Sequence, residues 1–239
     1  MDGRKVCSAV GGEEIAMMES SEVLFKIFGL GVTAEVVTMW GIIGVIAVIC
    51  LIATGRMKER PGRFQNLIET GVEYLQNFFH GILGEKSRRY FPFLSTLFIF
   101  IIFSNYSGLI PGAGVFRYFK APTSSFSVTL GLGIVTFLGL QYYAIRVGVG
   151  HFFKRFITPA AFMLPLLLLD EIIKPASLAM RLFGNIFGEE TVTEELYGLL
   201  PIGAPALMMG LSLLFCAIQA VVFTMLTAIY LDEATELEE

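Results

Sequence analysis

The sequence carries little charge for its length. Only 16% of its 239 residues are Asp, Glu, Lys or Arg, whereas about 25% is usual in a soluble domain, and 55% are hydrophobic. So little polar surface excludes a disordered chain and an ordinary cytosolic enzyme. The formal net charge of −4 argues against a nucleic-acid partner, since neutralising phosphates requires a basic surface.

Residues that build metal sites and catalytic groups are also scarce. Cys7, Cys50 and Cys216 are scattered, so no disulfide framework can be read. His80 and His151 have no Glu or Cys at ligand spacing, and no serine has a plausible histidine partner. No glycine-rich loop ends in Gly-Lys-Ser or Gly-Lys-Thr, so we do not expect the chain to bind ATP. No metal, cofactor or catalytic residue is predicted.

Long apolar runs dominate the chain instead. Each holds about the 20 residues that a helix needs to cross a bilayer, and all are too long for barrel strands. We therefore predict an all-α, polytopic helical membrane protein with about five membrane helices. A single membrane domain would cover residues 32–239, after an N-terminal extracytoplasmic segment at 1–31. The predicted membrane helices are residues 32–54, 91–112, 126–147, 159–200 and 205–231.

Residues 61–84 show a different pattern, in which apolar residues recur at helical spacing between polar ones. This predicts an amphipathic helix. Two placements fit equally well: the helix lies on the membrane surface, or it packs on the polar loops of the bundle.

The distribution of Lys and Arg predicts the orientation. Alternating sides along the chain gives ten of these residues on one side of the membrane and five on the other. The richer side belongs in the cytoplasm, which puts the N-terminus outside and the C-terminus inside. The acidic start resembles neither a signal peptide nor a transit peptide, which favours a bacterial plasma (inner) membrane.

The fourth run contains an unusual number of ionisable and small residues. On a helix, one narrow stripe would hold Asp170, Lys174, Ser177, Arg181, Gly184, Asn185 and Gly188, opposite Ala179, Met180, Leu182, Phe183, Ile186 and Phe187. Charged groups inside a membrane usually face a bundle interior or a water path. Asp170 and Lys174 are four residues apart and are expected to neutralise each other, a structural pairing more than a mechanistic one.

Arg181 is the least explained residue of that stripe. It has no acid three or four residues away on either side, and Glu190 falls on the opposite face. Because a guanidinium does not lose its proton in a protein, Arg181 needs an acid from another helix or another chain. Gly184 and Gly188 would let a further helix approach closely.

Two weaker signals remain. Ser212, Gln219 and Tyr230 share one face of the last run, and taken alone this favours ordinary hydrogen bonding between helices. Gly131 and Gly133 in the third run favour helix packing over function.

The segment 174–185, which reads Lys-Pro-Ala-Ser-Leu-Ala-Met-Arg-Leu-Phe-Gly-Asn and is followed by Gly188-Glu189-Glu190, closely resembles the signature of subunit a of the F-type ATP synthase. Residues 219–230 resemble the final helix of that family. Residues 84–86, 89–92, 104–105 and 108–112 fit it too. The likeness runs in order from Val23 to Glu236.

This resemblance implies a non-catalytic, proton-translocating stator subunit. Its last two helices would form a long tilted hairpin against a ring of c subunits, each with one mid-membrane carboxylate reached by two aqueous half-channels. Peripheral stalk b subunits and the bilayer would be further partners. Arg181 corresponds to the arginine that faces the ring carboxylate, and Asn185, Glu190 and Gln219 match positions at the ring contact or half-channels. Further residues expected to line a half-channel or face the ring are Asp170, Glu171, Lys174, Ser177, Glu189, Ser212 and Tyr230.

One position departs from the family pattern. Many relatives have a histidine where this chain has Ser212, so water would take over part of the outer relay. Two other functions are compatible with several membrane helices. A stand-alone ion transporter or antiporter would also place charges in membrane helices, but such proteins usually carry internal repeats, which are not evident here. A membrane scaffold leaves Arg181 unexplained.

Overall fold

The computed structural model describes residues 23–27, 30–55, 62–109, 122–148, 164–199 and 203–235. Most of the predicted segment 1–31, the end of the predicted helix 91–112, and both the start and the last residue of the predicted helix 159–200 lie outside these ranges. The described elements are almost entirely helical, as the sequence predicts.

Six α-helices lie within the described ranges. They are α2 (Ala34–Gly55), α3 (Arg63–Leu83), α4 (Ser87–Gly108), α5 (Phe126–Val147), α7 (Leu164–Leu199) and α8 (Gly203–Thr235). Two short 3-10 helices, η1 (Gly84–Lys86) and η2 (Pro122–Ser124), precede α4 and α5. The predicted boundaries differ from these by a few residues. Helix α4 starts at Ser87 and not at residue 91, because Arg88 and Arg89 belong to the helix although they lie outside the apolar run. Helix α8 continues past residue 231 to Thr235.

An antiparallel pair of short strands, β1 (Val23–Ile27) and β2 (Leu30–Thr33), leads into α2. The sequence analysis did not predict it. The strands are only five and four residues long, too short to produce a clear alternating pattern.

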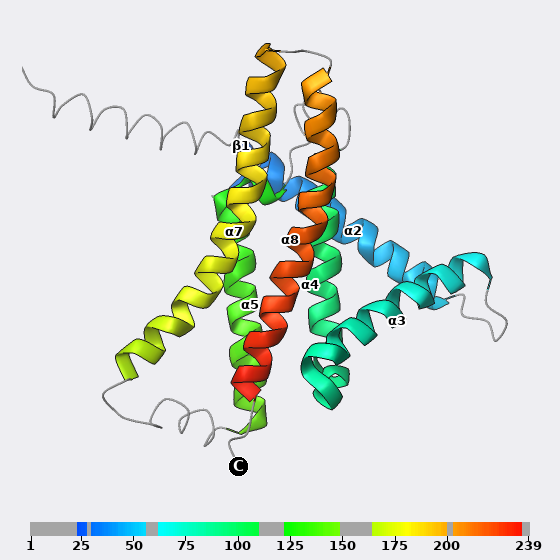
Figure 1. Ribbon diagram of the computed structural model, residues 1–239, viewed down its shortest axis with the longest axis vertical. Helices are drawn as coiled ribbons and strands as arrows, with labels where there is room; N and C mark the ends of the chain where they lie inside the picture. Colours follow the sequence, from blue (N-terminus) through cyan, green and yellow to red (C-terminus); the bar gives the residue numbers. More distant parts are fainter. Residues whose placement is uncertain are drawn as a thin grey trace, which may run out of the picture.

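Helices α7 and α8 run side by side along the long axis, and their connected ends project beyond α4 and α5 (Figure 1). At about 1.5 Å per residue, the 36 residues of α7 extend for about 54 Å. Helix α8 contacts α3, α4, α5 and α7, so it is the central element of the bundle. Helices α2 and α3 splay to one side (Figure 1).

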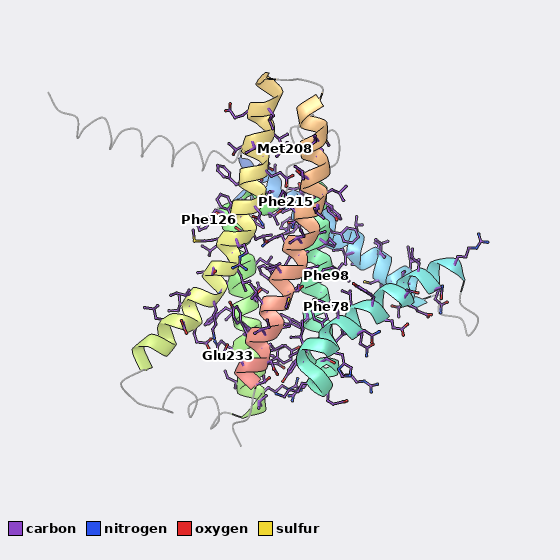
Figure 2. All side chains as sticks on the ribbon, in the orientation of Figure 1. Phe78, Phe98, Phe126, Met208, Phe215 and Glu233 are labelled. Carbon is purple, nitrogen blue, oxygen red and sulfur yellow. The ribbon has the colours of Figure 1, made fainter. Side chains whose placement is uncertain are left out.

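The core has two parts along α8. One lies where α8 ends and meets α3 and α4, around Phe79, Leu94 and Leu231. The other lies midway along α8 and includes Leu182 and Phe223. Figure 2 shows Phe215 on the part of α8 near its start and Glu233 at its far end, which marks the direction of the helix. Because Leu182 is fully buried, this second part of the core fixes the rotation of α7 about its axis.

Four helical stretches of the described chain are long and apolar enough to cross a membrane. They are α2, Gln65–Gly108, α5 and Leu207–Thr235. Helix α7, with its row of charged and polar residues, is not among them. Helix α2 is the most exposed of the four, and Leu51 has 72% of its surface free. Such apolar exposure fits contact with lipid.

The two halves of α3 behave differently. Phe79 and Leu83 near its end are buried against the bundle, whereas Leu67 and Tyr74 leave 71% and 73% of their surfaces exposed. The second half therefore packs on the apolar core of the bundle and not on its polar loops. A membrane-surface position remains the prediction for the first half.

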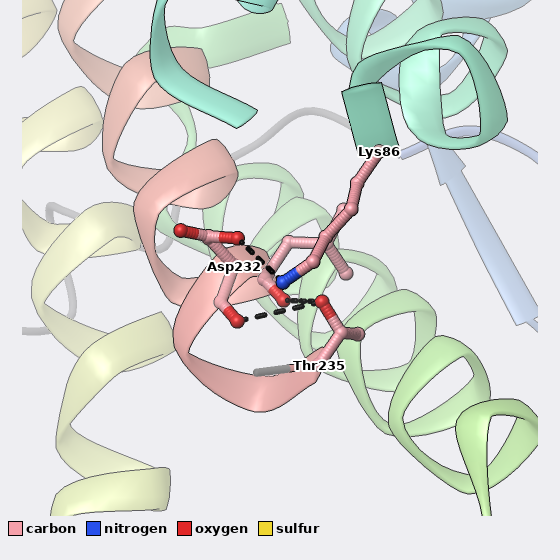
Figure 3. Close-up of polar contacts among 4 residues, drawn as sticks. Lys86, Asp232 and Thr235 are labelled. Atoms are coloured by element: carbon pink, nitrogen blue, oxygen red, sulfur yellow. Dashed lines mark hydrogen bonds and ion pairs between the residues drawn. The ribbon is translucent and has the colours of Figure 1, made fainter. Parts of the chain in front are cut away.

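A surface ion pair connects the end of α8 to the corner between α3 and α4. The Lys86 ammonium lies 3.3 Å from an Asp232 carboxylate oxygen (Figure 3). The two side chains are 45% and 37% exposed. We predict that Lys86→Ala lowers the free energy of unfolding by no more than about 1 kcal/mol, because water screens such pairs.

This prediction is checked by heating the detergent-solubilised assembly and recording the midpoint of its dissociation. The midpoint of Lys86→Ala should match that of Arg88→Ala, an exposed neighbour with no recorded pairing among the described residues. A clearly lower midpoint for Lys86→Ala alone would show that the pair holds α8 in place.

Candidate functional site

Arg181 lies on an open face of α7. The side chains that fix the helix against the bundle are Leu178, Leu182 and Ile186, all at most 5% exposed. The opposite side exposes Ser177, Arg181 and Gly184, together with Met180 at 64%. Among the described residues, Arg181 makes no recorded hydrogen bond or ion pair. The acid that the sequence analysis called for is thus not supplied by the described part of this chain.

The two glycines beside Arg181 also face open space. A Cβ atom added to Gly184 or Gly188 would meet nothing within 4 Å. None of the described helices makes the close approach expected at these glycines. The described part of the chain therefore leaves the surface around Arg181 uncovered.

Next to this open face, α7 and α8 are joined by a hydrogen bond between side-chain amides. The Asn185 Nδ2 atom donates to Gln219 Oε1 at 2.8 Å. Gln219 is only 2% exposed, and its Nε2 atom has no hydrogen-bond partner among the described residues. Asn185 and Gln219, which belong to different apolar runs of the sequence, are therefore in contact, and the Nε2 donor of Gln219 is not used.

A second contact joins the same helices one turn further along α7. Ser212 and Cys216 of α8 both lie close enough to Glu189 for its carboxylate to interact with them. Ser212 and Cys216 are buried, at 2% and 1% exposed. Glu190, the next residue, is half-buried and makes an interaction of its own.

Helix α4 adds polar groups that the sequence analysis did not assign to the site. The Asn105 Nδ2 atom donates to the Cys216 carbonyl at 3.5 Å, and the Tyr106 hydroxyl donates to the Leu213 carbonyl at 3.3 Å. Ser104 and Asn105 are 0% and 1% exposed, and Ser104 Oγ and Asn105 Oδ1 lack partners. Their signal was a cluster of polar residues, 104–107, inside an otherwise apolar run.

The other end of α7 corrects one prediction. Lys174 does not pair with Asp170, which is exposed and makes no hydrogen bond or ion pair with a described residue. The Lys174 ammonium instead lies 2.8 Å from the Glu233 carboxylate and 5.3 Å from the centre of the Tyr230 ring. Because α8 packs against α7, Lys174 reaches both a carboxylate and an aromatic ring on α8. These two interactions together are more favourable than an ion pair with Asp170, one turn away on its own helix. Gln141 of α5 donates to Glu171 at 2.9 Å.

The polar residues of α7 and α8 therefore form two groups, one on each side of Arg181 along α7. Glu189, Asn185, Ser212 and Gln219 lie towards the connected ends of α7 and α8, and Glu171, Lys174, Tyr230 and Glu233 lie towards the opposite ends. No group of three or more His, Cys, Asp or Glu residues in the described ranges could hold a metal ion.

Comparison with known proteins decides the family. The family model described as "ATP synthase A chain" matches residues 36–232. The chain belongs to the ATP synthase subunit a family. A protein named ATP synthase subunit a from Moorella thermoacetica is 37% identical over 210 residues, which cover 86% of this chain and 94% of the relative. A protein of the same name from Trichlorobacter lovleyi is 37% identical over 205 residues, which cover 84% of this chain and 86% of the relative.

As a member of the subunit a family, the chain is a non-catalytic membrane subunit of a multisubunit ATP synthase. Its function belongs to ATP synthesis and ion transport, and it acts together with other subunits. These statements agree with the long apolar helices, which provide the membrane-spanning part.

Proposed function

We propose that the chain is the stator subunit that lets ions reach a rotating ring of c subunits, and that Arg181 faces the ring carboxylate. Ions would enter through one aqueous half-channel and leave through the other, so that ion flow turns the ring. The coupling ion of this proposal is the proton.

The observation that carries the proposal is the position of Arg181. A permanently charged guanidinium on an exposed helix face inside a membrane is costly unless an acid from outside pairs with it. The described part of the chain does not supply that acid, and the surrounding surface of small residues is open to another helix. A ring helix carrying a carboxylate satisfies both requirements.

The arginine would have two effects on a passing ring subunit. Its charge stabilises the ionised carboxylate, so the carboxylate releases its ion as it arrives. It also repels a cation that would otherwise cross directly from one half-channel to the other. One elementary charge moving through 100 mV releases about 2.3 kcal/mol, so the free energy of several such steps is needed for each ATP.

The two polar groups on either side of Arg181 support a path with two half-channels. In the proposed orientation the outer half-channel holds Asn185, Glu190 and Gln219, with Glu189 and Ser212 beside them. The inner half-channel holds Asp170, Glu171, Lys174, Ser177 and Tyr230. The membrane would be the bacterial inner membrane, with the N-terminus outside, the C-terminus in the cytoplasm and b subunits of the peripheral stalk as further partners.

Reconstitution separates this proposal from the stand-alone transporter. The purified chain alone, placed in liposomes under a membrane potential, should show no ion uptake above that of empty liposomes. The ring, whose carboxylates carry the ion between the two half-channels, is missing from them. The complete ATP synthase in the same liposomes should take up ions when ATP is added. Uptake by the chain alone would favour the transporter.

A further inference from the structure

We propose that Gln141 of α5 is a positioning residue for ion transport, because its side-chain amide holds the Glu171 carboxylate of α7 in place at the inner end of the ion path. This inference rests on the proposed function. It adds to that function a residue of α5, a helix to which the sequence analysis assigned no site residue.

The interface between α5 and α7 becomes polar only towards the inner ends of the two helices. A Cβ atom added to Gly133 of α5 would lie 3.1 Å from the Ala179 Cβ atom of α7. Eight residues further along α5 and eight residues back along α7, or about 12 Å on each helix, Gln141 Nε2 donates to Glu171 Oε2 at 2.9 Å. Small apolar residues suffice for close packing at the first contact. Packing alone therefore does not account for a glutamine and a glutamate at the second.

Glu171 also lies where α7 lacks a backbone hydrogen bond. Pro175 is inside α7 and has no N–H group, so it cannot donate to the Glu171 carbonyl, which would be its partner in a regular helix. Side chains of the neighbouring helices contact this turn from both sides. Gln141 holds Glu171 from α5, and Glu233 of α8 lies 2.8 Å from the Lys174 ammonium. The orientation of the Glu171 carboxylate therefore depends on Gln141.

The hydrogen bond distinguishes between two adjacent acids. Asp170 is exposed and makes no hydrogen bond or ion pair with a described residue, whereas Glu171 is half-buried and turned towards α5. A hydrogen bond to an ionised group is about twice as strong as one between neutral groups, so the amide holds this carboxylate firmly. Glu171 precedes Arg181 by ten residues, or about 15 Å along α7. It is thus the acid held inside the bundle on the inner side of Arg181.

Gln141 has a further polar atom at this place. Its Oε1 atom is buried and has no hydrogen-bond partner among the described residues. Ordered water is the usual partner of such a group, and it would lie beside Glu171. In ATP-driven transport the Glu171 carboxylate would take up one proton from the inner water and release it to the water that leads to the ring. The carboxylate is then restored, and no bond between heavy atoms changes.

The test follows ATP-driven acidification of inverted membrane vesicles, in which the medium bathes the inner side of the path. Gln141→Leu removes the amide, and Glu171→Gln removes the charge but keeps a hydrogen bond between two amides. We expect each variant to lower uptake by about fivefold or more, since a displaced or missing proton carrier commonly costs more than this. Because Gln141 acts through Glu171, the double variant should stay within about twofold of Glu171→Gln alone.

A matched control comes from the exposed part of α3. Gln65 Nε2 donates to Glu69 Oε1 at 2.8 Å, so Gln65→Leu removes the same kind of pair at a site away from α7. Its uptake should remain within about twofold of that of the unmodified chain. Blotting for the complex corrects every value for assembly.

Exchanging the two side chains separates positioning from packing, and it does so even if Gln141→Leu fails to assemble. Gln141→Glu combined with Glu171→Gln keeps one carboxylate and one amide across the same gap. We expect this exchange to retain at least about half of the unmodified uptake.

Four results would overturn the positioning role. They are normal uptake by Gln141→Leu, normal uptake by Glu171→Gln, a double variant whose loss is the product of the two single losses, and an exchange no better than Glu171→Gln. If Arg181→Ala abolishes uptake in the same vesicles, any of them refutes only the role of Gln141. If Arg181→Ala takes up protons normally, the proposed function itself fails.

Discussion

Arg181→Ala should assemble into the complex and lose coupled ion transport by about a hundredfold or more. Removing one partner of a buried ion pair costs about 3–5 kcal/mol, and each 1.4 kcal/mol is about a factor of ten in rate. Arg181 has no partner among the described residues, so its removal should leave the fold of this chain intact while the ring carboxylate loses its counter-charge. ATP-driven uptake by inverted vesicles measures the loss.

Two further variants sharpen this prediction. Arg181→Lys should also lose about tenfold or more, because a lysine ammonium cannot present the planar two-pronged donor of a guanidinium. Arg146→Ala is the matched control, since Arg146 is an exposed arginine at the end of α5 whose recorded contact is the Tyr142 side chain. Normal uptake by an assembled Arg181→Ala complex would contradict the role assigned to this residue.

Gly133→Leu should lower uptake by about tenfold or more, through a residue that does not touch the ion path. A Cβ atom at Gly133 would lie 3.0 Å from the Pro175 carbonyl oxygen and 3.1 Å from the Ala179 Cβ atom. Since one of these is backbone, a leucine must push α7 away from α5, and overpacking of this kind costs about 1–3 kcal/mol. It also displaces Arg181, and a shift of about 1 Å at a reacting group can cost about a hundredfold.

The neighbouring glycine provides the control for this prediction. A Cβ atom at Gly131 meets nothing within 4 Å, so Gly131→Leu adds the same side chain to the same helix without moving α7. Its uptake, corrected for the amount of assembled complex, should stay within about twofold of the unmodified chain. Equal losses in the two variants would show that α5 does not set the position of α7.

The helices and the open face around Arg181 follow from sequence because both depend on local spacing. Apolar runs of bilayer length predict the membrane helices, and the helical repeat puts Ser177, Arg181 and Gly184 on one side of α7. Those residues are indeed exposed together in the structure. Spacing also identified Gly133 as a packing residue, although it did not distinguish Gly133 from Gly131.

The parts that the sequence did not predict depend on how distant segments meet. Lys174 has an acid at helical spacing, yet it pairs with Glu233, 59 residues away, because α8 packs beside it. The contact of Glu189 with Ser212 likewise requires the register of α7 against α8. The contact of Ser104 and Asn105 with the buried face of α8 could not be predicted either, because it depends on how α4 packs against α8.

The most direct test of the central claim is a photocrosslink from the open face of α7. Benzoylphenylalanine would replace Met180, which is 64% exposed beside Arg181, in the assembled complex, and Leu51 of α2, which is 72% exposed, would serve as the control position. We predict that light joins the Met180 position to a c subunit of the ring, while the Leu51 position gives only lipid adducts. Lipid adducts alone at Met180, in an assembled and active complex, would contradict the claim that Arg181 faces the ring.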